Sequence, residues 1–246
     1  MLITIVTAVY NREDTVAQAV ASVRDQTYPF VEHVVIDGGS SDTTLARIKS
    51  CRSPRVVIRS GPDKGIYDAL NKGITLARGE VVGLMHSDDY FSHRQVIERV
   101  AKAFTDPELD LVYGDLDYVS AKDPQKIVRK WRSGSYSRSS LARGWMPPHP
   151  TVFARRRVIE QMGSYDTSYR IAADYDAILR WFGSPNVKCA YLPEVLVKMR
   201  TGGESNRSLD RILLKSREDL QAMRTNGVGG IGTLLLKNAR KFGQFI

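Results

Sequence analysis

Two adjacent carboxylates, Asp88 and Asp89, follow an apolar run over residues 81–85 and close the tetrad His86-Ser87-Asp88-Asp89. The run predicts a buried strand. Ligands of open α/β sheets collect at the carboxyl ends of the parallel strands. Adjacent carboxylates repel each other unless a cation or a donor offsets them, and their oxygens suit Mg²⁺ or Mn²⁺ shared with substrate phosphates. The tetrad therefore indicates a metal–diphosphate site or a solvated strand end in which one Asp caps the next helix.

Polar groups also follow the earlier predicted strands. Thr7, Ala8 and Tyr10 lie at the end of the first strand, and Asp37 ends the second. An acidic side chain after the second strand of such a sheet can accept hydrogen bonds from a nucleobase or from ribose hydroxyls. The glycines that follow Asp37 are equally compatible with a plain turn.

A third group of polar residues opens a helix. Lys64 stands at the start of the predicted helix 66–77, which carries Asp68 and Asn71. A lysine beside free backbone N–H groups at a helix start suits phosphate or sugar oxygens. Together the three groups predict a nucleotide-linked ligand bridged by a metal ion.

The elements that position these groups alternate between strand and helix. Strands are predicted over residues 2–9, 33–36, 55–58 and 81–85, with helices after residue 14 and over residues 66–77. Further helices are expected over residues 95–104, 172–182 and 209–223, and further strands over 109–119 and 192–199. This alternation predicts one doubly wound α/β domain. The basic segment around the Pro-rich residues 147–150 is expected to cross the sheet as a loop.

Size and composition fit one large soluble domain, with 246 residues of which 42% are hydrophobic. Cys51 and Cys189 form neither a disulfide framework nor a metal-ligand spacing, so we expect a reducing compartment. The N-terminus lacks the basic region of a signal peptide, and no apolar run has the length of a membrane span. We therefore expect a cytoplasmic protein.

The net charge of +9 is concentrated in one segment. Residues 126–157 contain Lys and Arg but no Asp or Glu, and outside this segment basic and acidic residues are equal in number. Such a segment attracts nucleic acid, an anionic membrane surface or a phosphorylated substrate, or it is a solvated basic face.

The order and spacing of six motifs resemble the family 2 glycosyltransferases, over roughly residues 1–205, and most closely the members that assemble bacterial surface polysaccharides. The matching segments are residues 7–12 (TAVYNR), 35–42 (VIDGGSSD), 63–73 (DKGIYDALNKG), 86–89 (HSDD), 149–151 (HPT) and 173–176 (ADYD). The resemblance implies a GT-A fold, which is a Rossmann-like α/β domain with a mixed central sheet. It also implies an inverting, Mn²⁺- or Mg²⁺-dependent hexosyl or deoxyhexosyl transfer from a nucleotide-diphosphate sugar to a saccharide acceptor, which we expect to be lipid-linked.

The resemblance also assigns roles to single residues. Asp174 becomes the general base, and Asp176 a structural residue. Asp89 coordinates the metal. Donor-binding positions are Thr7, Ala8, Tyr10, Asp37, Lys64, Asp68, Asn71, Asp88 and Arg200, the last reaching the diphosphate from a Gly-rich loop.

Three positions leave alternatives open. His86 stands where the family often has an acidic residue, and it is either a metal ligand or a hydrogen-bonded structural residue. Asp174 follows Ala173 where the family more often has Glu, and its alternative role is a helix N-cap. His149 lies where the acceptor should enter, and it either binds sugar or braces the Pro-rich loop.

The C-terminal residues 227–246 form a predicted tail after a domain of residues 1–226. Leu234, Leu235, Phe242 and Phe245 lie opposite Lys237, Arg240 and Lys241 on a helical wheel. A basic amphipathic helix of this kind can lie on the inner leaflet of the membrane, or it can pack on protein. We expect a peripheral membrane contact near a lipid-linked acceptor.

Two other functions compete with glycosyl transfer. A sugar-1-phosphate nucleotidyltransferase also joins a nucleotide site to a metal, but residues 7–13 lack its Gly-rich phosphate loop. A basic nucleic-acid-binding module would explain residues 126–157, whereas the acidic strand ends would repel a phosphate backbone. We therefore expect no nucleic-acid partner.

Overall fold

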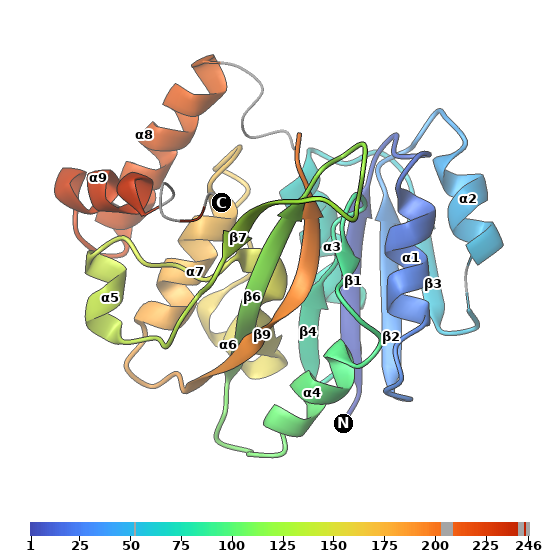
Figure 1. Cartoon of the computed structure of the whole chain (residues 1–246), viewed down its shortest axis with the longest axis horizontal. Coiled ribbons are helices and arrows are strands. Elements are labelled where there is room, and N and C mark those ends of the chain that lie inside the picture. The colour runs from blue at the N-terminus through green and yellow to red at the C-terminus, as the bar shows by residue number, and fades with distance from the viewer. Residues whose placement is uncertain (52, 203–208, 241–243, 245–246) are drawn as a thin grey trace.

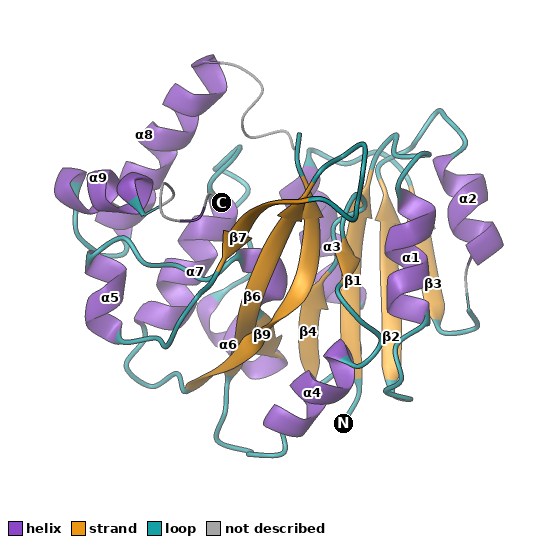
Figure 2. Cartoon of the chain, viewed as in Figure 1, coloured by secondary structure: helices purple, strands orange, loops and turns teal. Residues whose placement is uncertain are grey.

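The computed structural model describes residues 1–51, 53–202, 209–240 and 244. Within them, one mixed sheet has the strand order β3-β2-β1-β4-β8-β6-β9-β5, and β7 pairs with β6 (Figure 1). Helices cover both faces of this sheet (Figure 2). The predicted α/β architecture is confirmed.

The first half of the chain forms the parallel part of the sheet. Its strands are β1 (Ile3–Val9), β2 (Val31–Asp37), β3 (Val56–Ser60) and β4 (Val81–Leu84). Its helices are α1 (Val16–Arg24), α2 (Thr44–Cys51) and α3 (Ile66–Leu76). β1 lies between β2 and β4, and all three run in the same direction. Their carboxyl ends therefore meet at one edge, as the sequence predicts.

The second half makes the sheet mixed. It contains β5 (Tyr90–Phe91), α4 (Val96–Ala103), β6 (Leu111–Val119), β7 (Ile127–Trp131), α5 (Arg138–Ala142), the 3₁₀ helix η1 (His149–Thr151), β8 (Phe153–Arg155), α6 (Arg156–Met162), α7 (Ala173–Gly183), β9 (Cys189–Arg200), α8 (Leu209–Thr225) and α9 (Ile231–Ala239). β8 is antiparallel to both β4 and β6, whereas β6 and β9 are parallel.

Alternation along β1 assigns its side chains to two cores. Ile3 and Ile5 pack in the core shared with α1 and α4, whereas Val6 and Ala8 pack in the core shared with α3 and α5–α8. Successive side chains of a strand point to opposite faces of its sheet. Odd-numbered side chains of β1 therefore point to the face covered by α1 and α4, and even-numbered ones to the face covered by α3.

The basic segment is not a loop, contrary to the sequence expectation. It contains β7, α5, η1 and β8. Its three consecutive arginines are engaged within the protein: Arg155 donates to the carbonyl of Leu109, Arg156 to that of Gly79, and Arg157 to the carboxylate of Asp110. Arginine is suited to this because one guanidinium offers several donors to carbonyls left open at the ends of elements. Part of the charge excess thus braces the fold.

The tail helix α9 packs on the domain with its lysine inward. Lys237 is 4% exposed and pairs with Asp219 of α8 at 2.8 Å, whereas Leu235 and Leu236 are exposed. The hydroxyl of Thr233 donates to the carbonyl of Ala142 at 2.7 Å. The sequence predicts that the basic residues of the tail lie in water, but Lys237 is buried. Leu235 and Leu236 are exposed and not packed on the domain.

The aromatic residues expected on the apolar face of the tail, Phe242 and Phe245, lie outside the described residues. Over the part of the chain that the structure describes, no helix is both long and apolar enough to cross a bilayer.

Candidate active site

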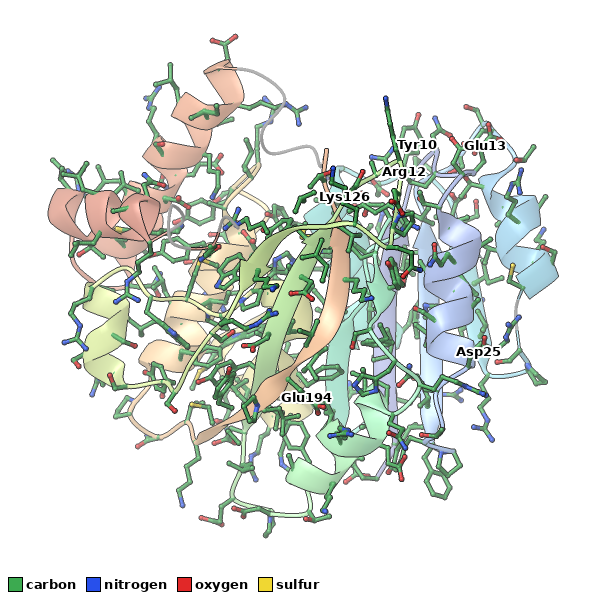
Figure 3. All side chains as sticks on the ribbon, viewed as in Figure 1. Tyr10, Arg12, Glu13, Asp25, Lys126 and Glu194 are labelled. Carbon is green, nitrogen blue, oxygen red and sulfur yellow. The ribbon has the colours of Figure 1, made fainter. Side chains whose placement is uncertain are left out.

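A cavity of about 450 Å³ opens between the end of β1 and the start of α3. Its lining residues are Ala8, Val9, Tyr10, Asn11, Arg12, Asp63, Gly65, Ile66, Ala69 and Ser87. Tyr10 and Arg12 lie at the upper edge of the molecule in Figure 3, the edge to which β1 and β2 point in Figure 1. The cavity thus occupies the place where the sequence predicts a nucleotide ligand, and Ala8 and Tyr10 line it as expected.

Asp63 is an acidic group in this lining that residue-by-residue prediction did not select. Its Oδ1 accepts the N–H of Gly65 at 2.9 Å. Its Oδ2 lies so close to Gly38 that a Cβ there would approach it to 2.5 Å. The glycine at position 38 therefore makes room for the Asp63 carboxylate. The motifs around Asp37 and Lys64 marked both segments in the sequence. That Gly38 and Asp63 approach each other became visible only in the folded structure.

Thr7 and Asp37 are not among the described residues that line the cavity. Both side chains are fully buried. The Thr7 hydroxyl lies 2.9 Å from Nε2 of His33, and the Asp37 carboxylate accepts hydrogen bonds from the hydroxyls of Ser40 and Ser60. The position along β1 accounts for this difference, because Ala8, Val9 and Tyr10 at the strand end line the cavity whereas Thr7 lies further from that end. Both residues support the strand ends instead of facing the cavity.

The polar residues of α3 are also engaged within the protein. Asp68 accepts the backbone N–H of Lys64 at 2.9 Å and pairs with Lys72 at 2.9 Å, so it fixes the first turn of the helix. Asn71 makes two hydrogen bonds with the backbone of Tyr165, at 2.7 and 3.0 Å. Lys64 itself is exposed outside the cavity lining. These three positions shape the donor side of the site indirectly.

Asp88 and Asp89 differ in their surroundings. Asp89 is 1% exposed, and its Oδ1 accepts the N–H of Arg200 at 3.0 Å while Oδ2 has no partner. Burial, and then the charge of Asp88, raise the pKa of Asp89 well above its ordinary value. Asp88 is half-buried, and no donor of the described chain binds its carboxylate. Asp88 is therefore the carboxylate of the pair that the described chain leaves open to a ligand. The roles expected of the pair, a metal ion at Asp89 and donor contacts at Asp88, stay predictions.

Arg200 ends β9 and does not project from a loop. Its guanidinium donates to the carbonyl of Asp88 and to the side chain of Gln18, and it lies over the ring of Tyr90. Its side chain is 9% exposed. Arg200 is thus a buried counter-charge beneath the tetrad, and the expected reach to a diphosphate would require these bonds to break. Residues 203–205 of the expected Gly-rich loop lie outside the described residues.

Asp174, in the first turn of α7, lies within a second polar cluster. Its Oδ2 is 3.2 Å from Nδ1 of His149, and Nε2 of His149 is 2.8 Å from Nε2 of His86. The Tyr67 hydroxyl donates to the carbonyl of Ile171 at 2.5 Å and lies 3.4 Å from Oδ1 of Asp174. Both ring nitrogens of His149 therefore have partners within the protein. His86 is hydrogen-bonded to His149, as one of its two expected alternatives has it.

Charges around Asp174 keep it ionised. Burial raises its pKa, but His149, Lys215 and Lys237 outweigh burial, so that the net pKa of Asp174 lies below its ordinary value. Burial lowers the pKa of His149 to about 4 and also lowers that of His86. At neutral pH the cluster is therefore one carboxylate with two neutral imidazoles. The Asp174 side chain remains 21% exposed, which leaves it accessible to a substrate.

The backbone N–H groups around the start of α7 have two acceptors. Glu218 of α8 accepts the successive backbone N–H groups of Arg170, Ile171 and Ala172 at 3.0, 2.8 and 2.9 Å. Oδ1 of Asp174 accepts the N–H of Tyr175 in the first turn at 2.8 Å. Open N–H groups at a helix start are normally satisfied in this way. Oδ1 of Asp174 thus has part of the alternative capping role, and Oδ2 faces His149.

Asp176 has the structural role expected of it. It pairs with Arg180 at 2.8 Å and accepts a hydrogen bond from Asn226 at 2.9 Å.

Comparison with known proteins identifies the family. The family described as Glycosyl transferase family 2 matches residues 4–179. The chain belongs to glycosyl transferase family 2. Among its relatives, a PGL/p-HBAD biosynthesis glycosyltransferase of Mycobacterium bovis is 32% identical over 79% of this chain and 75% of that protein. The succinoglycan biosynthesis protein ExoO of Rhizobium meliloti is 32% identical over 70% of this chain and 53% of that protein.

Solved glycosyltransferases share the fold. TarS 1–349 of S. aureus, in complex with UDP-GlcNAc, superposes with a TM-score of 0.70 at 19% identity, over 93% of this chain and 66% of that one. The mannosyltransferase PcManGT from Pyrobaculum calidifontis, in complex with GDP-Man and Mn²⁺, gives 0.67 at 17% identity, over 98% and 69%. The expected GT-A fold is confirmed. Family membership favours glycosyl transfer over the nucleotidyltransferase and nucleic-acid-binding alternatives.

Proposed function

We propose that the protein is an inverting glycosyltransferase that moves a hexose or deoxyhexose from a nucleotide-diphosphate donor to a hydroxyl group of a saccharide. The observation that carries this proposal is the position of α3. Ile66 lines the cavity, and the next residue, Tyr67, reaches the carboxylate of Asp174. A donor in the cavity and a base at Asp174 would therefore lie on either side of the first turn of α3.

In this reaction Asp174 accepts the proton of the acceptor hydroxyl. The acceptor oxygen forms a bond to the anomeric carbon while the bond from that carbon to the diphosphate oxygen breaks, on the opposite side of the sugar. The configuration at the anomeric carbon inverts. A well-placed base contributes about 10²–10⁴-fold to the rate, and an accessible, ionised Asp174 fits this role.

The donor nucleoside would occupy the cavity beside Tyr10. The tyrosine ring is 57% exposed and offers a flat apolar surface to a nucleobase. Asp63 provides a hydrogen-bond acceptor for N–H groups at the base edge. The expected nucleobase contact of Asp37 is thus reassigned to Asp63.

A divalent cation fits the tetrad through Asp88. The described residues hold no group of three metal-ligating side chains. Mg²⁺ needs only one or two carboxylates when substrate phosphates complete its coordination, and the open Asp88 carboxylate meets that need. Mg²⁺ or Mn²⁺ bound there would offset charge on the departing diphosphate. The buried Asp89 would support this site from below and not coordinate the ion directly.

The acceptor is proposed to be a saccharide carried by a lipid at the inner leaflet, which would make the protein peripheral to the membrane. Ile231, Leu235 and Leu236 of α9 are all at least half exposed. Exposed apolar side chains on an amphipathic helix favour an interfacial position. Flotation with anionic liposomes tests this contact, and wild type and Leu235→Glu floating equally would exclude α9 as the contact.

Donor binding is the first test of the proposed function. A panel of UDP-, GDP- and dTDP-sugars with Mn²⁺ or Mg²⁺ is examined by calorimetry and by slow donor hydrolysis, beside Asp88→Asn and Asp174→Asn. We expect one donor to bind in a metal-dependent way, with binding lost in Asp88→Asn and retained in Asp174→Asn. In Asp88→Asn, donor hydrolysis should fall because the donor no longer binds. In Asp174→Asn, hydrolysis should fall although the donor still binds. Failure of the folded wild type to bind any donor would contradict the proposal.

A further inference from the structure

His86, His149 and Asp174 form a continuous chain of close polar contacts that links three separate elements. His86 follows β4, His149 begins η1, and Asp174 lies in the first turn of α7. The Nε2 atoms of the two imidazoles are hydrogen-bonded at 2.8 Å, and Nδ1 of His149 lies 3.2 Å from Oδ2 of Asp174. A proton between the two heavy atoms of each contact removes the repulsion between their lone pairs.

The ionisation of Asp174 fixes where these protons lie. An ionised carboxylate only accepts hydrogen bonds, so Nδ1 of His149 must carry a proton. A neutral imidazole has one N–H, which leaves Nε2 of His149 as an acceptor. Nε2 of His86 must then be the donor of the second link. The chain has one consistent arrangement of protons, in which the N–H groups of His86 and His149 both point toward Asp174.

The same contacts limit the mobility of the Asp174 carboxylate. Oδ1 accepts the N–H of Tyr175 at 2.8 Å, and Oδ2 faces His149. The other charged or titratable groups around it are Tyr67 from α3, Lys215 from α8 and Lys237 from α9. His149 is the group whose ring nitrogen lies 3.2 Å from Oδ2. His149 therefore both orients this oxygen and stabilises its negative charge.

We propose that His149 is a positioning residue that holds the Asp174 carboxylate in place as the base, and that His86 fixes His149 in the tautomer this requires. This inference rests on the proposed role of Asp174. It replaces a direct contact between His149 and the acceptor. It also accounts for histidine at the first position of the tetrad, since an aspartate there would repel Asp174 and could not donate to Nε2 of His149.

The first test observes the protons directly and needs no substrate. The full-length protein is labelled with ¹⁵N, and the imidazole nitrogens are recorded at pH 7.5. The chain has four histidines, so single substitutions assign each ring. We expect protonated Nδ1 and bare Nε2 on His149, and protonated Nε2 on His86. A bare Nδ1 or a protonated Nε2 on His149 would overturn the proposal.

The second test follows the Asp174 carboxyl carbon by ¹³C NMR during a pH titration. His149→Leu removes the donor to Oδ2, whereas the side-chain amide of His149→Asn can replace it. We expect the pKa of Asp174 to rise in the leucine variant and to return toward the wild-type value in the asparagine variant. Equal pKa values in wild type and His149→Leu would contradict the proposal, because a merely structural histidine would leave them equal. Melting temperatures confirm that both variants are folded.

The third test separates positioning from acceptor binding. Release of nucleoside diphosphate from UDP-N-acetylglucosamine, UDP-glucose and GDP-mannose with Mn²⁺ is measured for wild type, His149→Leu and His149→Asn. We expect kcat to fall at least about tenfold in His149→Leu, which is part of the rate that a well-placed base contributes. His149→Asn should recover part of this loss, and the KM for the donor should stay unchanged in both variants. An unchanged kcat would sink the positioning role. Donor hydrolysis absent from the wild type would count against the proposed function, whereas the two NMR tests would still decide the proton arrangement and the pKa effect.

Discussion

The ammonium nitrogen of Lys237 lies 3.2 Å from the centre of the Tyr175 ring, so α9 contacts the residue next to Asp174. The nitrogen also pairs with Asp219, which has a second partner in Lys215. The proximity of Lys237 and Lys215 helps to keep Asp174 ionised. Helix α9 is thus coupled to the surroundings of Asp174 through its buried lysine, while Leu235 and Leu236 stay exposed.

The first prediction concerns Lys237. Burial lowers its pKa from 10.5 to about 7. Between these values the unfolded chain binds more protons than the folded one, so this residue makes stability rise as the pH rises from 7 toward 10. Lys237→Met should lose that rise and unfold at the same or a higher urea concentration at pH 7, since Asp219 keeps Lys215. Urea midpoints at pH 7 and 9 test this, with the exposed Lys188→Met as control. A rise retained in Lys237→Met would refute the assignment.

The second prediction separates the two carboxylates of the tetrad. Asp88→Ala should abolish metal-dependent donor binding and leave the melting temperature nearly unchanged, because the wild-type carboxylate has no partner within the described chain. Asp89→Ala should destabilise the fold by about 1–3 kcal/mol, because the buried backbone N–H of Arg200 loses its acceptor. Calorimetry and thermal unfolding measure the two effects. A stable Asp89→Ala that alone loses metal binding would restore the original assignment of the ion to Asp89.

The third prediction concerns the three N–H groups held by Glu218. Glu218→Ala leaves them without an acceptor, and an unsatisfied buried donor costs about 1–3 kcal/mol. We expect a lower free energy of unfolding and a loss of transfer activity, because the start of α7 carries Asp174. Glu218→Gln retains one side-chain carbonyl and should lie between alanine and wild type. Urea unfolding beside donor hydrolysis gives both values, and a fully active Glu218→Ala would show that the base needs no such anchor.

The fourth prediction is a loss of stability in acid. Burial lowers the pKa of His33 to about 3. Between pH 6.5, the ordinary pKa of histidine, and pH 3, His33 is protonated in the unfolded chain but not in the folded one. The free energy of unfolding therefore falls as the pH falls through this range. His33→Gln should reduce this slope and keep a group near the Thr7 hydroxyl. Urea midpoints from pH 7.5 to 4.5 test it, with His93→Gln on the surface as control. Identical slopes in His33→Gln and wild type would rule the residue out.

The fifth prediction concerns nucleotide recognition by Asp63. Asp63→Ala should weaken donor binding about tenfold or more, which corresponds to at least 1.4 kcal/mol. The side chain is partly exposed at the cavity, so we expect little change in melting temperature. Asp37→Ala is the contrasting variant, because it should destabilise the protein by removing the acceptor of Ser40 and Ser60. Stronger loss of binding in a stable Asp37→Ala would return the nucleobase contact to that residue.

Much of the fold follows from local patterns in the sequence. The apolar alternation and the polar strand ends place β1, β2 and β4 and the shared edge at their carboxyl ends. The family motifs select Asp174 as the candidate base. Neither step requires knowledge of which residues distant in the chain come together.

The errors share a different origin. Thr7 and Ala8 are neighbours in the chain, yet the pleat sends them to opposite faces, and nothing in the motif says which face carries the ligand. Arg155 has the same charge whether it is solvated or bound to carbonyls 46 residues away, so net charge alone could not exclude a free basic patch. His149 and His86 are 63 residues apart, and their contact depends on how η1 lies against the end of β4.

The adjacency of Ile66 and Tyr67 has a mechanical consequence. The wall of the cavity and the hydroxyl that steadies the segment before α7 are consecutive residues of one helical turn, and a helical turn is a stiff body. The distance from the cavity to the segment that leads into α7 is therefore constrained by α3, because the Tyr67 hydroxyl holds the carbonyl of Ile171. A displacement of that turn would shift the cavity wall and the contact with Asp174 together.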